Sequence, residues 1–130
     1  MSLPGEVRLS GNGSTLEVTG NFRADGKIGA EAVGRIESSG HFEAGKSQTS
    51  TITLTDAELA VTDPASMMFF ARDHTTIVEA TRSQITAAGV LYVGERSHAK
   101  VTLRGGTMAA ESIYIGNDSA GEGWLVLEQD

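Results

Sequence analysis

The densest group of ionisable side chains in this sequence is Arg72-Asp73-His74. A carboxylate and an imidazole beside a positioning guanidinium are the residue types of a general acid–base pair, as in enzymes that cleave polysaccharides. The segment 23 residues later, Glu95-Arg96-Ser97, is just as polar but has no histidine, which is typical of a solvated corner. Active sites of that kind also collect ionisable groups from several adjacent segments, and no such column is evident. We therefore expect no catalytic residue, with a polysaccharide lyase or hydrolase as the alternative.

Metal and cofactor chemistry has little support in the residue pattern. His41, His74 and His98 share no ligand spacing, and the chain has no cysteine that could supply a thiolate ligand, a nucleophile or a disulfide. No glycine cluster fits a phosphate-binding or dinucleotide-binding fingerprint. We expect neither a metal site nor a cofactor.

Three aromatic residues recur at nearly constant spacing. Phe69, Tyr92 and Tyr114 are the middle residues of three short triplets whose flanking residues are apolar. If each triplet is a strand with its flanking residues inward, all three rings point outward in one column. Such a column is either a binding stripe for a glycan or a protein partner, or a ladder that stabilises the sheet through ring contacts. The sequence leaves both interpretations open.

The aromatic spacing belongs to a longer repeat. When the sequence is shifted by 23 residues, Met68 falls on Leu91 and Val78 on Val101, and a third copy begins at Ile113. Apolar triplets that recur every 22 to 24 residues are typical of stacked short strands, one coil per repeat. They predict an all-β fold, a right-handed parallel β-helix (β-solenoid). An up-and-down sandwich would not explain the shared offset.

We expect residues 1–130 to form a single β-helical domain, part of a longer solenoid, with irregular coils over 1–66 and regular repeats over 67–130. One inward position per coil gives about six short coils; these positions are Val18, Ser38, Leu54, Ala80, Leu103 and Leu127. The side chains expected to be buried are Met68, Phe70, Val78, Ala80, Ile85, Leu91, Val93, Val101, Leu103, Met108, Ile113, Ile115, Leu125 and Leu127.

The repeat also resembles a known family. Leu91-Tyr92-Val93-Gly94, the segment Val101 to Met108, Ile113-Tyr114-Ile115-Gly116 and Leu125-Val126-Leu127 are similar to the repeat of bacterial autotransporter passenger domains and of related exported surface proteins. The match covers about residues 89–127. The resemblance implies a right-handed β-helical stalk on a secreted or surface-exposed bacterial protein, whose export signal lies outside this sequence.

On this basis the expected function is that of a non-catalytic structural or adhesive module, a passenger-type stalk or adhesin. The expected partner is a glycan or a host or cell-surface protein. The alternative is a carbohydrate-binding or carbohydrate-active β-helix, such as a phage tailspike-like domain.

Composition excludes two other classes of partner. The formal net charge is −7, and the 10 lysine and arginine residues are scattered singly. A nucleic-acid interface or an anionic membrane surface requires a concentrated basic patch. No apolar run approaches the roughly 18 residues of a membrane span, so membrane insertion is not expected.

The last triplet carries an unusual pair of outward residues. If Leu125 and Leu127 face inward, Trp124 and Val126 face outward, where the preceding coil has the water-compatible Lys100 and Thr102. The change to apolar residues predicts that something covers this face. We expect Trp124 and Val126 to form an interface, with a homo-oligomer through the C-terminal coil as one possibility.

Overall fold

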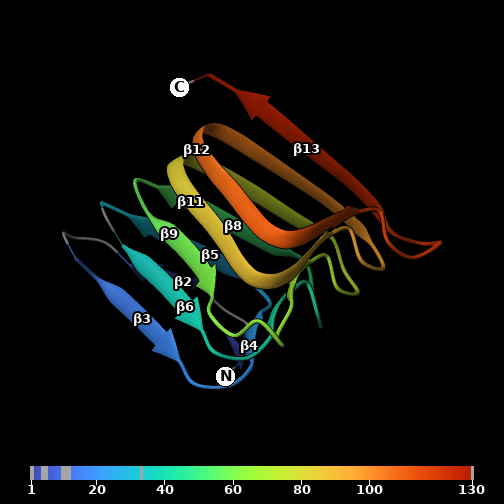
Figure 1. Cartoon of the computed structure of the whole chain (residues 1–130), viewed down its shortest axis with the longest axis horizontal. Coiled ribbons are helices and arrows are strands. Elements are labelled where there is room, and N and C mark those ends of the chain that lie inside the picture. Colours follow the sequence, from blue (N-terminus) through green and yellow to red (C-terminus); the bar gives the residue numbers. More distant parts are fainter. Residues whose placement is uncertain (1, 4–5, 10–12, 33, 130) are drawn as a thin grey trace.

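The computed structural model describes residues 2–3, 6–9, 13–32 and 34–129, which form one continuous parallel β-solenoid of about five turns (Figure 1). The colours in Figure 1 change in order along the stack, so each coil lies on the one before it in the sequence. The predicted all-β, right-handed parallel β-helix is confirmed. Within the described part of the chain, no helix is long and apolar enough to cross a membrane.

Each coil has three sides, named here A, B and C in chain order. Side A stacks β2 (Glu6–Leu9), β5 (Lys27–Glu31), β8 (Ser50–Thr55), the first parts of β11 (Thr76–Val93) and β12 (His98–Ile115), and β13 (Glu122–Glu128). Side B stacks β3 (Thr15–Val18), β6 (Arg35–Ser38), β9 (Glu58–Val61) and the middle parts of β11 and β12. Side C stacks β1 (Ser2–Leu3), β4 (Phe22–Ala24), β7 (Phe42–Ala44), β10 (Met68–Phe70) and the last parts of β11 and β12.

The repeat offset seen in the sequence is the register of the strands. Met68 pairs with Leu91, and Val78 pairs with Val101, as the shift by one repeat predicts. An irregularity in the pairing between Ala87 and Val90 then shortens the next coil. Alternation along each strand follows from this stacking, because every second side chain enters the narrow interior.

A glycine makes one of the sharp corners possible. Gly94 ends side C with a φ of 85°, a conformation that costs other residues free energy. A Cβ atom at this position would overlap the main-chain carbonyl of Glu122 on the next coil.

The interior is a stack of aliphatic side chains with phenylalanines on side C. The rings of Phe22 and Phe42 lie 5.3 Å apart, and Phe42 contacts Phe70 edge-on at 6.4 Å. Of the side chains expected to be buried, nine are buried, namely Met68, Phe70, Val78, Ala80, Ile85, Leu91, Val93, Val101 and Leu103. Met108 and Leu125 are partly buried against the core.

Three predictions of burial are wrong. Ile113, Ile115 and Leu127 are exposed, although each continues an inward column. They lie on the outermost rung of the described coils, and no described strand stacks on their free side. Burial in a solenoid needs a neighbouring coil on both sides, so alternation alone does not determine it.

The predicted list of one inward position per coil needs correction. Val18 and Ser38 lie on side B, where the next residue in register is Val61. Leu54 belongs to side A, whose register continues through Ala80, Leu103 and Leu127. The list of inward positions therefore joined two different sides. The structure has about five turns, and side A stacks six of the described strands, in agreement with the predicted count of about six short coils.

Candidate functional site

The predicted aromatic column is present on the outer face of side C. Phe69, Tyr92 and Tyr114 pair in register on β10, β11 and β12. The first two rings are 5.1 Å apart with planes 5° from parallel, and the second two are 5.4 Å apart with planes at 18°. The three rings form one continuous stack along the solenoid axis.

The two ends of the aromatic stack differ. At the lower end the guanidinium carbon of Arg72 lies 4.0 Å from the centre of the Phe69 ring, and His41 meets that ring edge-on at 6.0 Å. Phe69 is only 4% exposed as a result, although it points outward. Tyr114 at the upper end is 48% exposed. Because adjacent rings face each other, a ligand ring cannot lie flat between them.

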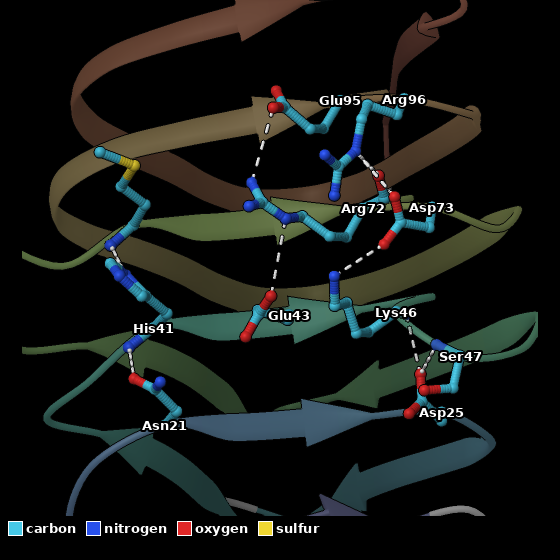
Figure 2. Close-up of polar contacts among 11 residues, drawn as sticks. Asn21, Asp25, His41, Glu43, Lys46, Ser47, Arg72, Asp73, Glu95 and Arg96 are labelled. Carbon is cyan, nitrogen blue, oxygen red and sulfur yellow. Dashed lines mark hydrogen bonds and ion pairs between the residues drawn. The ribbon is translucent and has the colours of Figure 1, made fainter.

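Glu43, Arg72 and Glu95 form a column of charged residues that crosses successive coils (Figure 2). Arg72 stands between two carboxylates, with Nε 3.6 Å from Glu43 on the coil below and Nη1 3.5 Å from Glu95 on the coil above. Glu95 also accepts a hydrogen bond of 2.7 Å from the side-chain amide of Asn117. The Arg72 Nε atom is buried without a hydrogen bond, and the guanidinium lies over the Phe69 ring.

A parallel row of charges runs along the same corner (Figure 2). Asp73 accepts one hydrogen bond of 2.9 Å from Lys46 below it and forms an ion pair of 2.7 Å with Arg96 above it. Partial burial raises the pKa of the Asp73 carboxyl, but the hydrogen bond and charge of Lys46 and the charge of Arg96 outweigh it and hold the pKa below its usual value. Asp25, one coil further down, accepts hydrogen bonds of 2.8 Å from the main-chain N–H groups of Lys46 and Ser47.

The expectation that no polar column spans several coils is therefore wrong. Arg72 and Asp73 are partners in two rows of alternating charge that connect successive coils, while His74 is exposed beside them. The repeat offset could not reveal Lys46, because it lies 27 residues before Asp73 instead of 23. The coil between Lys46 and Asp73 is longer than the regular repeat, so Lys46 lies outside the regular 23-residue spacing.

The three histidines lie at separate places. His41 accepts a hydrogen bond from the main chain of Met67 at Nδ1 and approaches the Phe69 ring. His98 lies on side A, 3.3 Å from Glu122. In the described segments, no group of three or more histidine, aspartate or glutamate side chains is arranged to hold a metal ion.

The outward pair near the C-terminus is placed as predicted, on β13 of side A. Trp124 pairs in register with Lys100, and Val126 with Thr102. Trp124 is 49% exposed and stacks on His98 with ring centres 6.0 Å apart. Thr102 is buried instead of solvated, although it points outward between its register partners Glu79 and Val126. An interface formed by Trp124 and Val126 stays a prediction.

A second paired cluster at the corner between sides A and B was not predicted. Arg82 binds both carboxylate oxygens of Asp56, at 2.8 and 2.9 Å, and Arg35 joins Glu37 and Glu58. The hydrogen bond from Arg82 lowers the pKa of Asp56. Arg35, Asp56, Glu58 and Arg82 line a shallow groove of about 470 Å³.

Comparisons with known proteins add no relative. No family model matches this sequence, and no curated protein or solved structure matches it. The resemblance to autotransporter passenger repeats stays a prediction based on the repeat itself.

Proposed function

We propose that this chain is a non-catalytic structural module, a β-helical stalk or adhesin segment of an exported or surface-exposed bacterial protein. The observation that carries the proposal is that the polar groups on side C bind one another along the solenoid axis. Glu43, Arg72 and Glu95 form one such row, and Lys46, Asp73 and Arg96 form the next.

These pairs are poorly suited to acid–base catalysis. A general acid in glycoside cleavage needs a carboxyl with a raised pKa. The pKa of Asp73 is lowered instead, because Lys46 and Arg96 stabilise its charged form. Arg72 is likewise occupied by two carboxylates and the Phe69 ring, so it is a poor clamp for a substrate anion.

The same contacts are well suited to holding coils together. In a solenoid each coil contacts only its neighbours, so stability depends on the interfaces between coils. The ion-pair rows and the ring stack run across these interfaces, from β7 through β12. A network of this kind contributes more than isolated surface ion pairs do.

A carbohydrate-binding or carbohydrate-active β-helix, of the phage tailspike-like class, is the second candidate. It is favoured by two aromatic side chains, Tyr114 and Trp124, each about half exposed on an outer face. Exposed aromatic rings beside polar groups are common in ligand sites.

The proposal is tested by assaying the whole chain for release of reducing sugar from acidic and neutral polysaccharides at pH 5 and pH 7. We expect no release above a heat-inactivated control. Asp73→Asn and Glu43→Gln should lower the melting temperature and leave that null result unchanged. Release that disappears in Asp73→Asn would establish an enzyme and refute the proposal. A glycan array with the wild-type chain then separates an adhesive module from a purely structural one.

A further inference from the structure

The outer face of side A carries a second column, which differs from the one on side C. Lys27, Thr51, Ile77, Lys100 and Trp124 pair in register on five successive rungs. Ile77 is 41% exposed and Trp124 is 49% exposed, an unusual pair of large apolar side chains on an otherwise polar face. We call this row the side-A column.

A hollow lies at the upper end of the side-A column. It has a volume of about 340 Å³ and is lined mainly by Ile77, His98, Lys100 and Trp124. The indole stacks on His98 at 6.0 Å with planes 23° from parallel, so one of its faces is covered. Trp124 is 49% exposed, so part of its side chain is available to a ligand, whereas Phe69 and Tyr92 on side C cover one another.

The charges of the side-A column also differ from those on side C. Lys46, Arg72 and Arg96 are all held in ion pairs. Lys27 and Lys100 make no ion pair with any residue in the described ranges, and Lys100 stands directly beside Trp124. The nearby carboxylate of Glu122 lies 3.3 Å from His98 Nδ1. Lys27 lies further down the same column, so the ammonium group beside the exposed indole is that of Lys100, and its positive charge favours an anionic ligand.

We propose that the side-A column binds an acidic oligosaccharide. The C–H face of one sugar lies against the indole of Trp124, and a carboxylate or sulfate group pairs with Lys100. Thr75 also lines the hollow, and its hydroxyl is the group that would hydrogen-bond a sugar hydroxyl. This inference rests on the proposed adhesive function and names its ligand class.

A folded protein is a poorer fit to the same surface. A stable protein–protein interface buries about 800 Å² on each partner around a well-packed apolar centre. Here the exposed apolar part is essentially Ile77 and Trp124, flanked by lysine and threonine. A narrow strip of this composition matches a single extended saccharide chain.

The test uses intrinsic fluorescence, because Trp124 is the only tryptophan in the chain. The whole chain is titrated with oligogalacturonate, with a sulfated oligosaccharide and with a neutral oligosaccharide of the same length. We expect a saturable change with an acidic ligand that weakens as salt is raised, and a weaker response to the neutral one. The two acidic ligands distinguish a uronate from a sulfate ester.

Variants are compared by isothermal titration calorimetry. Trp124→Ala should weaken binding about tenfold, as expected for a central aromatic contact. Lys100→Gln should weaken it by up to about fivefold and reduce the salt dependence. Arg104→Gln is the matched control on the same side: it removes one positive charge that already pairs with Glu128, and binding should persist.

Three results would overturn the inference. The first is the absence of saturable binding to any acidic saccharide. The second is binding that is lost in Tyr114→Ala and kept in Trp124→Ala, which would place the ligand on side C and leave the adhesive function intact. The third is a dimer in sedimentation velocity that Trp124→Ser converts to a monomer, which would make a second copy the occupant. Cleavage of a ligand bound at Trp124 would instead refute the non-catalytic function and support this site.

Discussion

Replacing Tyr92 with alanine is the most direct test of whether the aromatic column supports the fold or binds a ligand. Tyr92 is the central ring, with Phe69 at 5.1 Å and Tyr114 at 5.4 Å. An aromatic pair contributes about 0.5–1.5 kcal/mol beyond the area that it buries. Losing both contacts should therefore lower the free energy of unfolding by about 1–3 kcal/mol.

The measurement is urea unfolding followed by far-UV circular dichroism and by Trp124 fluorescence. A double-mutant cycle of Tyr92→Ala and Tyr114→Ala isolates one ring pair, and its coupling energy should be about 0.5–1.5 kcal/mol. Thr53→Ala is the control, since Thr53 is an exposed outward position on side A. Exposed substitutions of this type stay within about 0.5 kcal/mol of the wild type.

The outcome that would refute the ladder is equally specific. If Tyr92→Ala changes the unfolding free energy by less than about 0.5 kcal/mol, with coupling to Tyr114 near zero, the rings do not stabilise the coils. If the same variant abolishes glycan binding, the column is a binding stripe.

Three further predictions test the core, one corner and the charge rows. Leu103→Asp places a charge in the stacked interior, so the loss of unfolding free energy should exceed the about 2–5 kcal/mol of a leucine-to-alanine change. The measurement is hydrogen exchange, in which β11–β13 should lose protection. Protection equal to the wild type would contradict the packing. Gly94→Ala should cost more than about 2 kcal/mol, because a positive φ is combined with an overlap onto the carbonyl of Glu122. Gly20→Ala is the control: Gly20 also has a positive φ, but no atom lies near its Cβ position, so the loss of unfolding free energy should be about 1 kcal/mol. Equal losses for Gly94→Ala and Gly20→Ala would rule out the overlap. Asp73→Asn should lower the melting temperature at pH 7. Because the folded pKa of Asp73 is lowered, its contribution is full above the unfolded value of about 3.9 and is lost as the pH falls through the folded value. The difference from the wild type should therefore disappear in acid, and a constant difference across pH would show that charge is not its source.

The sequence by itself determined the strand pattern and the register of the regular coils. A parallel solenoid places each residue on its equivalent one coil away, so a repeat in sequence becomes a stack in space. This is why the repeat alone predicts that Met68 pairs with Leu91 and Phe69 with Tyr92. Alternation within each triplet then assigned the aromatic rings to the outer face.

Only the tertiary structure decided which polar groups meet and which rings remain open. The irregular coils differ in length, so the partnership of Lys46 with Asp73 has no fixed offset to reveal it. Arg72 covers the Phe69 ring because its side chain extends from the corner back over the strand. Side-chain direction within a face is set by contacts with neighbouring coils, and a one-dimensional repeat carries no information about them. For the same reason, the sequence did not predict that Trp124 is half-exposed while Phe69 and Tyr92 on side C cover each other.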